Sequence, residues 1–487
     1  MLLRIDKHPI LEFNDKQKIF FYFNNKKLYG FEGDSIASAL HAQNIRILTR
    51  SLKYDRPRGF FCGIGKCSSC LMRVDGVPNV RTCIAPLKEG IHVNLQDKLP
   101  DLPNAKFEQN PMQIIDVDVL IVGAGPAGLS ASIEVAKQGA SVLLVDENLK
   151  VGGQLVKQTH KFFGSKQEKA GTRGTQIAID LEKELKELEK TDKVKLMLNS
   201  TVIGYYESKG EKHKFGVIKR DDYLSTLYEI NCKTVIFACG AMENMLLFPG
   251  NDLPGVYGAG AVQTLMNVYG VKPGNKVIMV GAGNVGLIVS YQLLQAGIEV
   301  DRVVEAAPFI GGYHVHAAKL RRCGVPIYTS HSIIEVYGKN KVEGAVVAKL
   351  DKNWQPINSS EEKVKCDTVC LAVGLTPSTR LLSQVGVEME YVPEAGGYVA
   401  LHNDSMETTV KGVYVAGDSS GIEEASTAIV EGKIAGISAT MSLGYDKNAK
   451  KLKNQYLKQL ENLRAGPFGE KPRIAKNKIQ KILEKTT

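Results

Sequence analysis

The sequence predicts an α/β protein of several domains, and three observations support this. The chain has 487 residues, more than one hydrophobic core usually organises. A strand-like segment, a Gly-rich turn and a helix-like segment follow one another twice, first near residue 114 and again near residue 276. Four of the nine cysteines lie within residues 62–83, before either of these units. We therefore expect a small N-terminal domain followed by two nucleotide-binding α/β domains.

The composition is that of an ordinary globular protein, with 44% hydrophobic and 23% charged residues. No apolar run is long enough to span a bilayer, and the N-terminal residues do not resemble a signal peptide, so we expect a cytoplasmic protein. The net charge is +10, and residues 447–487 contribute +9 through twelve Lys or Arg and three Glu. This basic tail could bind an acidic partner or nucleic acid. We favour a solvated helical tail packing on another subunit, because it contains no nucleic-acid motif.

Residues 1–98 are expected to form a β-grasp-like domain. KIFFYF, the turn NNKK and LYGF indicate a hairpin at about residues 19–32. Asp34 or Ser35 can cap a short helix in SIASALHAQN, and LMRVDG indicates a later strand. Residues 99–113 are rich in Pro and Asn and lack periodicity, which predicts a linker.

The cysteine-rich segment predicts a metal centre. Its spacing is Cys62-x4-Cys67-x2-Cys70-x12-Cys83, which is typical of plant-type ferredoxins and predicts a 2Fe–2S cluster held by these four thiolates. Glycines within the loop let it curl so that backbone N–H groups face the sulfurs. The alternatives are a zinc site or cysteines without metal, but zinc usually takes paired C-x2-C units and only one is present. The remaining cysteines are interpreted as packing residues: Cys232, Cys239, Cys323, Cys366 and Cys370.

The first nucleotide-binding unit predicts an FAD site, built by residues 114–255 and 379–445. Its G-x-G-x-x-G turn follows a strand, opens a helix and precedes an acid at the end of the next strand. The helix start offers N–H groups to a pyrophosphate, and the acid can bind a ribose hydroxyl. A later Gly-Asp pair at a strand end is expected beside the flavin. The predicted FAD-binding residues are Gly123, Gly125, Pro126, Ala127, Gly128, Asp146, Glu147, Gly153, Gln154, Val202, Gly240, Gly417 and Asp418.

The second unit, residues 256–378, predicts another adenine dinucleotide site. Its predicted binding residues are Gly281, Gly283, Asn284, Val285, Gly286 and Glu305. An acid at the strand end favours NAD over NADP, because it would repel a 2′-phosphate. The alternative is a retained fold without a working nicotinamide site. Neither unit carries a Cys pair for a dithiol relay. His160, His314 and His316 lie near Gly-rich turns, and we assign none of them as a base, so the catalytic residues stay unassigned.

Several segments resemble one enzyme family. They are RSLKYDRPRGFFCGIGKCSSC, VLIVGAGPAGLSAS, VLLVDENLKVGGQL, FACGAMENMLLFPGNDLPGVYGAGAVQTLMN, CLAVGLTPSTRLLSQVG and GVYVAGDSS. Over roughly residues 19–445 the chain resembles the alpha subunits of heteromeric flavin-dependent amino-acid dehydrogenases and oxidases. This group includes opine oxidase, dye-linked L-proline dehydrogenase, sarcosine oxidase and hydrogen cyanide synthase. The resemblance implies a glutathione or thioredoxin reductase-like flavoprotein fold behind the ferredoxin-like domain.

The resemblance also implies a division of labour between subunits. It implies that an amino or imino acid such as proline, hydroxyproline, sarcosine or an opine is oxidised at FAD on a beta subunit resembling an amino-acid oxidase. Electrons would then pass to this chain, in some members through an FMN at the subunit interface. The second dinucleotide site would hold NAD or ATP, and a small Cys-rich iron–sulfur subunit would complete some complexes. Two hypotheses remain beside this one: a self-sufficient NADH-dependent FAD/2Fe–2S reductase, and a scaffold subunit whose nucleotides are structural. None of the three involves nucleic acid.

Overall fold

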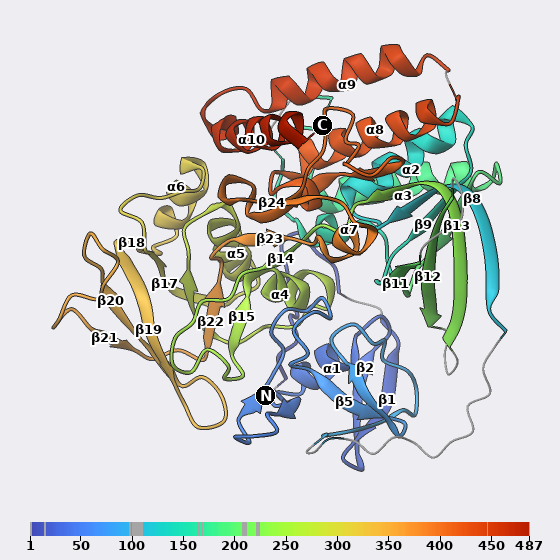
Figure 1. The fold of residues 1–487 in the computed structure, drawn as a ribbon. Coiled ribbons are helices and arrows are strands. Elements are labelled where there is room, and N and C mark those ends of the chain that lie inside the picture. Colours follow the sequence, from blue (N-terminus) through green and yellow to red (C-terminus); the bar gives the residue numbers. More distant parts are fainter. Residues whose placement is uncertain are drawn as a thin grey trace. The chain divides into compact units, whose positions relative to one another are not determined.

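The computed structural model describes residues 2–13, 16–96, 99, 111–162, 166–167, 169–206, 212–220, 225–445 and 447–486. It divides into two compact units (Figure 1). Unit 1 comprises Met1–Ala105 and Glu243–Gly374, and unit 2 comprises Lys106–Met242 and Leu375–Thr487. Short strands lie where the chain passes from one unit to the other, β14 (Ala241–Glu243) and β23 (Leu375–Pro377). Most of the predicted linker, residues 100–110, lies outside the described residues. The predicted domain limits stay predictions.

The N-terminal part of unit 1 is a five-stranded sheet in the order β2-β1-β7-β5-β6, with one helix. Asn24 and Asn25 both have positive φ, as a two-residue hairpin turn requires, and they confirm the predicted hairpin. Ser35 caps the helix through a capping box, so the second of the two expected caps is the one used. The elements are β1 (Lys18–Phe23), β2 (Lys26–Phe31), α1 (Ile36–Ala42), β3 (Thr49–Arg50), β4 (Pro57–Arg58), β5 (Leu71–Val74), β6 (Val77–Arg81) and β7 (His92–Asn94).

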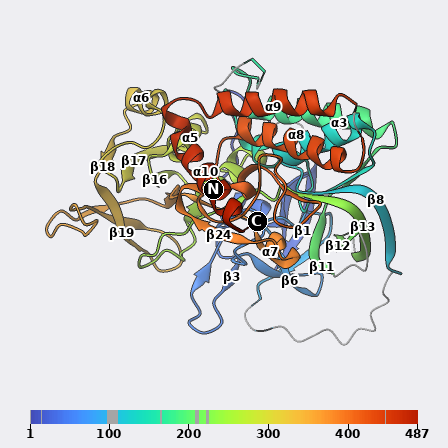
Figure 2. The same cartoon turned by 45° about the horizontal axis from the view of Figure 1, so that its top comes forward.

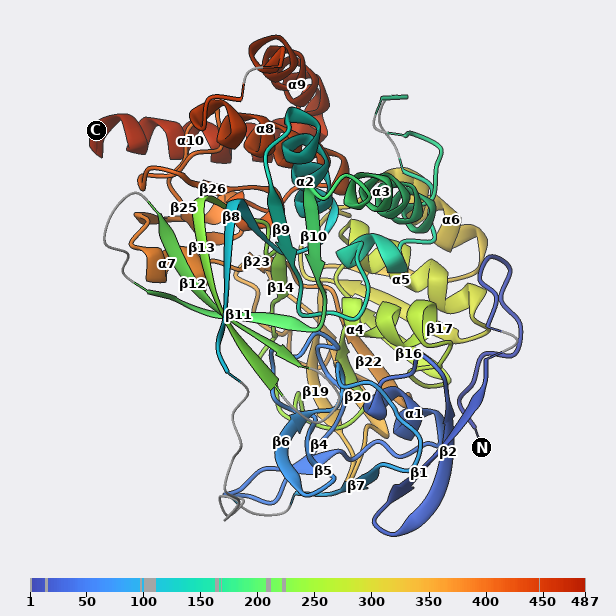
Figure 3. The same ribbon diagram turned by 90° about the vertical axis from the view of Figure 1, so that its right-hand side faces the viewer.

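The remainder of unit 1 is built on a parallel sheet in the order β15-β22-β16-β17-β18. Its central strands are almost wholly apolar, since helices cover a parallel sheet on both faces; Figure 3 shows α4 and α5 beside it. An antiparallel sheet, β19-β20-β21, follows. The elements are β15 (Val256–Gly258), α4 (Ala259–Gln263), a π-helical turn (Thr264–Val268), β16 (Lys276–Val280), α5 (Asn284–Gln295), β17 (Glu299–Glu305), α6 (His314–Arg322), β18 (Ile327–Thr329), β19 (His331–Tyr337), β20 (Gly344–Lys349), β21 (Glu362–Val364) and β22 (Thr368–Leu371).

The two parts of unit 1 share one hydrophobic core. Leu40 and Met72 of the N-terminal part belong to the same buried cluster as Leu265 and Met266. The first residues of the chain strengthen this junction. The Leu3 N–H donates to the Ala42 carbonyl at 2.8 Å, and the Lys272 N–H donates to the Leu3 carbonyl at 2.7 Å. The cysteine-bearing part is therefore fixed to the second nucleotide-binding part.

Unit 2 contains a seven-stranded sheet in the order β10-β9-β8-β13-β12-β11, with β26 also paired to β13. Helices α2 and α8 pack closely, and α9 runs alongside α8 (Figure 2). The elements are β8 (Gln113–Val122), α2 (Pro126–Gln138), β9 (Val142–Val145), α3 (Gly174–Glu189), β10 (Val194–Met197), β11 (Ser200–Tyr206), β12 (His213–Arg220), β13 (Ser225–Phe237), α7 (Arg380–Val385), β24 (Met389–Val392), β25 (Gly397–Ala400), β26 (Val413–Val415), α8 (Ala425–Ser442), α9 (Ala449–Leu463) and α10 (Glu470–Thr486), with 3₁₀ turns at Gly153–Lys157, Pro393–Ala395, Gly417–Ser420 and Pro467–Gly469.

Both predicted strand–turn–helix units are present, β8-α2-β9 in unit 2 and β16-α5-β17 in unit 1. The two amphipathic stretches expected after Tyr445 form α9 and α10, and both pack against unit 2 itself. Within the described residues, none of the helices combines the length and the apolar character that crossing a membrane requires.

Candidate cofactor sites

The turn between β8 and α2 is shaped for a phosphate. A methyl group added at Gly123 would lie 2.3 Å from the Ala238 carbonyl oxygen, and one added at Gly128 would lie 1.7 Å from the Gly123 oxygen. Gly125 caps α2 without a side-chain hydrogen bond, Pro126 follows it, and the first turn of the helix has no acidic residue. The first N–H groups of α2 are therefore available to an anion.

Asp146 ties this turn to the end of β9. Its Oδ2 accepts the Ala124 N–H at 2.6 Å, and its Oδ1 accepts the Asn148 N–H at 2.7 Å. Burial raises the pKa of this carboxyl group. The neighbouring Glu147 is only half-buried. Asp146 thus shapes the turn and stands where the sequence places a ribose-binding acid.

Three other predicted residues lie around the same turn. A methyl group added at Gly153 would lie 2.8 Å from the Gly125 Cα, so this glycine lets the second turn approach the first. Gly417 has φ +67° and lies against Ala127. The Gly240 carbonyl accepts the Ser419 hydroxyl at 3.2 Å. The structure therefore brings the predicted residues of three separate segments together.

The last predicted residues of this site differ in exposure. Gln154 is exposed, whereas Val202 is buried in β11. Asp418 is partly exposed, and desolvation by its surroundings raises the pKa of its carboxyl group to about 7. The Glu423 N–H is 3.4 Å from its Oδ1. Within the described residues this long hydrogen bond leaves the Asp418 carboxyl group with capacity for a polar ligand group, at the position where the sequence predicts the flavin.

The turn between β16 and α5 repeats this geometry in unit 1. Gly281 has the same φ as Gly123, +105°, and an added methyl group would again lie 2.3 Å from a carbonyl oxygen, that of Ala372. Glu305 Oε2 accepts the Ala282 N–H at 2.7 Å, and its Oε1 accepts the Ala307 N–H at 2.9 Å. Gly283 caps α5 without a side-chain hydrogen bond. The second unit is therefore a close structural repeat of the first.

The segment Gly312–Tyr313 packs over this second turn, which the sequence analysis did not predict. A methyl group added at Gly312 would lie 2.8 Å from the Gly283 carbonyl carbon, and the Tyr313 N–H donates to Asn284 Oδ1 at 2.8 Å. Val285 is exposed, and Gly286 is buried. The signal was available, because the Gly-Gly pair of this segment repeats the pair before Gln154 at a similar distance from the strand-end acid.

The four cysteines of the N-terminal part are free thiols that approach one another. The Cys62 thiol is within hydrogen-bonding reach of Cys67 and Cys83, and Cys70 is within reach of Cys83. Among the described residues, no group of three or more His, Cys, Asp or Glu side chains forms a ligand set for a metal ion. The contacts Cys62–Cys67, Cys62–Cys83 and Cys70–Cys83 nevertheless link all four thiols in one series. A 2Fe–2S cluster requires four thiolates, so the donor set fits it.

Backbone N–H groups surround these thiols. The Ile64 N–H points at the Cys62 sulfur at 3.5 Å. Hydrogen bonds from Cys67 and Cys83 lower the pKa of the Cys62 thiol. Gly65 has φ +70°, which lets the loop curl as predicted. A cavity of about 110 Å³ opens beside Cys67, the least buried of the four, with Arg58, Phe61 and Leu253 in its wall. The loop thus presents one edge of the thiol set to this cavity.

Comparisons with known proteins match the nucleotide-binding and the cysteine-bearing parts of the chain separately. Residues 117–432 match the pyridine nucleotide-disulphide oxidoreductase family, and residues 16–98 match the 2Fe-2S iron-sulfur cluster binding domain. The chain is 25% identical over 87% of its length to the alpha subunit of sarcosine oxidase from Rhizobium meliloti (strain 1021), of which it spans 46%. It is 27% identical over 67% of its length to an opine oxidase subunit from Agrobacterium tumefaciens (strain Ach5), spanning 66% of that protein.

Comparisons with solved structures agree with these family matches. L-Proline dehydrogenase from P. horikoshii is 26% identical, with a TM-score of 0.70 over 93% of this chain and 79% of that one. Thioredoxin reductase from T. acidophilum, 21% identical with a TM-score of 0.53 over 67% of this chain and 99% of that one, shows the shared fold. The resemblance and the fold class expected from the sequence are confirmed. The two family matches indicate FAD and a 2Fe–2S cluster as the cofactors. The chain spans about half the length of the sarcosine oxidase subunits that it matches.

Proposed function

Since the chain belongs to the pyridine nucleotide-disulphide oxidoreductase family, we propose that it is the electron-transfer subunit of a flavin-dependent amino-acid or imino-acid dehydrogenase. The observation that carries the proposal is the presence, in one chain, of a four-thiol cluster loop and an FAD-type turn without a redox dithiol beside it. FAD, when bound, supplies two-electron chemistry, and a 2Fe–2S cluster supplies one-electron chemistry. Together they convert paired electrons into single ones.

Each site contributes to this role through its own residues. Gly123 and Gly128 let the turn and α2 pack closely, Gly125 admits the pyrophosphate of FAD at the start of α2, and Asp146 holds the turn in place. Cys62, Cys67, Cys70 and Cys83 would hold the cluster, and the N–H of Ile64 would stabilise its negative charge. We assign no acid or base for amine oxidation in this chain and place that oxidation on a partner protein.

The relatives support the choice of substrate class and partner. The matched sarcosine oxidase and opine oxidase proteins are named as subunits, and the matched L-proline dehydrogenase acts on an imino acid. We therefore propose a hetero-oligomer with an amino-acid-oxidase-like beta subunit. Proline, hydroxyproline, sarcosine and opines are the substrates to test.

The test is dye reduction by the purified chain alone and by the chain co-purified with its partner. We expect turnover of one of these substrates only in the complex, with flavin and cluster of the present chain reduced during turnover. Full turnover of an amino acid by the isolated chain would contradict the division of labour.

A second candidate function is an NADH-dependent reductase, and the intact repeat at Gly281 and Glu305 favours it. Glu305 would repel the 2′-phosphate of NADPH, so NADH rather than NADPH would be the donor. Rapid mixing of the oxidised chain with NADH distinguishes the two functions. Bleaching of the flavin on mixing supports the reductase, and no bleaching at millimolar NADH would contradict it.

A further inference from the structure

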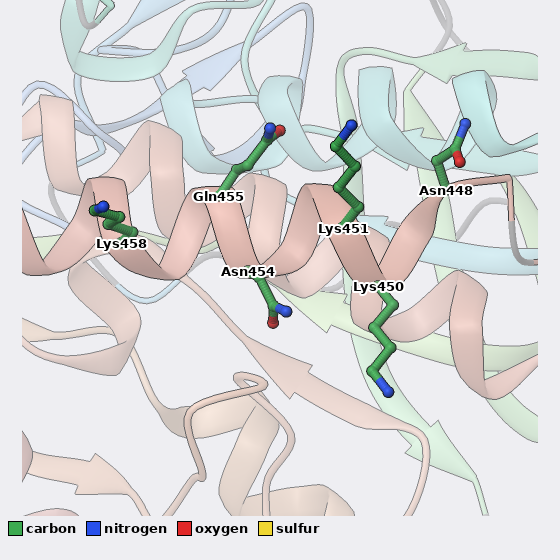
Figure 4. A pocket seen from close by; sticks show the side chains of 6 residues that line it. All are labelled: Asn448, Lys450, Lys451, Asn454, Gln455 and Lys458. Carbon is green, nitrogen blue, oxygen red and sulfur yellow. The ribbon is translucent and has the colours of Figure 1, made fainter.

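The basic C-terminal tail has two different faces. The outer face of α9 forms a hollow of about 660 Å³ lined by Asn448, Lys450, Lys451, Asn454, Gln455 and Lys458. Figure 4 shows that Lys450 and Asn454 point away from Lys451 and Gln455, so these side chains do not converge on one ligand. The inner faces of α9 and α10, in contrast, pack against unit 2. The contacts of the tail with the rest of the chain therefore lie on these inner faces.

Two cations of the tail reach a buried carboxylate. Glu431, on α8, is 2% exposed. Arg464, which follows α9, contacts Glu431 Oε1 at 2.5 Å, and Lys476, on α10, contacts the same oxygen at 2.9 Å. Arg464 also pairs with Glu423 at 2.6 Å. Because a buried carboxylate without partners is costly, these cations compensate Glu431.

The second oxygen of Glu431 holds the turn assigned to FAD. Oε2 accepts the Gly417 N–H at 2.9 Å and the Ser420 hydroxyl at 2.7 Å. Lys476 Nζ also donates directly to Ser420 Oγ at 2.7 Å and to the Ser420 carbonyl at 3.1 Å. The Glu431 carboxylate and the Lys476 ammonium group therefore hold Gly417–Ser420 on the side that faces α8 and α10. This turn carries Asp418 and lies against Ala127 at the start of α2.

We propose that Lys476 and Arg464 are positioning residues for the flavin, acting through Glu431 on the turn Gly417–Ser420. The inference rests on the proposed FAD site. It assigns the tail to cofactor binding within this chain. It also predicts that the charge of the tail affects the midpoint potential of the flavin. Loss of Lys476 or Arg464 would leave uncompensated negative charge in a low-dielectric region close to the flavin.

Lys476→Met tests the inference in the full-length chain, with Lys478→Met as the matched control. Lys478 lies two residues away on the same helix, is itself 49% exposed, and pairs with Glu394 rather than with Glu431. In Lys476→Met we expect FAD to bind about tenfold more weakly or worse, and the midpoint potential of the bound flavin to become more negative, because reduction adds negative charge. Lys478→Met should match the wild type in both measurements. Lys476→Arg, which keeps the charge, should retain most of the affinity.

A charge-compensating variant separates positioning from simple packing. Glu431→Gln combined with Lys476→Met removes the uncompensated charge, so the flavin potential should return towards the wild-type value. If Lys476→Met does not fold, Ser420→Ala removes the hydroxyl contacts of the turn with Lys476 and Glu431 and should also weaken FAD binding.

The outcomes distinguish this inference from the proposed function. A wild-type chain that binds no flavin contradicts the proposed function itself. A wild-type chain that binds flavin, together with Lys476→Met or Ser420→Ala variants of unchanged affinity and potential, contradicts the role of the tail.

Discussion

At the scale of single residues, the two Gly-rich turns make a matched pair whose members can be disabled one at a time. A methyl group at Gly128 would lie 1.7 Å from the Gly123 oxygen, and one at Gly286 would lie 2.0 Å from the Gly281 oxygen. We predict that Gly128→Ala removes FAD from the purified chain, because the turn and helix must separate, whereas Gly286→Ala leaves the FAD content unchanged. The ratio of flavin to protein absorbance measures this, with Gly204→Ala as a control because its added methyl group meets no close neighbour. Full FAD content in Gly128→Ala would contradict the assignment of the first turn.

Some residues of the site could be predicted from the sequence, and others could not. The glycines, Asp146 and Glu305 were predictable because a local motif has one geometry and each acid ends the next strand. The roles of Glu431 and Lys476 were not, because they lie in separate helices and meet only through tertiary packing. The sequence predicts a solvated helical tail that packs on another subunit; the structure adds that the apolar faces of its two helices, α9 and α10, pack on their own chain.

At the scale of elements, the N-terminal segment fastens the cluster-bearing part to the second nucleotide-binding part. Arg4 pairs with the buried Asp34 and donates to the Tyr269 carbonyl at 2.9 Å. We predict that Arg4→Ala lowers the free energy of unfolding by about 3 kcal/mol, because Asp34 would remain buried without its cation. Urea unfolding measures this. The control Arg50→Ala removes a pair whose partner Asp55 is 81% exposed and should cost less than about 0.5 kcal/mol; equal losses would contradict the role of Arg4.

Elements with a local pattern were predictable from the sequence, whereas the contacts of the N-terminal segment were not. The hairpin, the capped helix α1 and both strand–turn–helix units follow from alternation, capping residues and apolar periodicity. The segment at Leu3 and Arg4 has no such periodicity, and its partners lie around Ala42 and Lys272. Only the folded chain shows that the cluster-bearing part shares its core with a domain that begins more than a hundred residues later.

At the scale of the whole molecule, buried histidines predict how stability depends on pH. Burial lowers the pKa of both His41 and His402 to about 3. Below the ordinary value of 6.5 the unfolded chain therefore binds more protons than the folded one, so stability falls as pH falls. Each of these histidines should contribute about 1.4 kcal/mol per pH unit between pH 6.5 and about 3. Urea unfolding at a series of pH values should show a smaller slope in His41→Gln and an unchanged slope in His314→Gln, which alters an exposed residue; equal slopes would contradict this account.

The central claim is that flavin and cluster are held in the same chain and exchange electrons. An anaerobic reductive titration of the purified chain, followed by visible absorbance and EPR, tests it most directly. We predict one flavin and one 2Fe–2S cluster per chain, with the EPR signal of the reduced cluster appearing as the flavin is reduced, and with that signal absent in Cys70→Ser. Protein prepared without oxygen that contains neither iron nor flavin, and gives no EPR signal after dithionite, would contradict the claim.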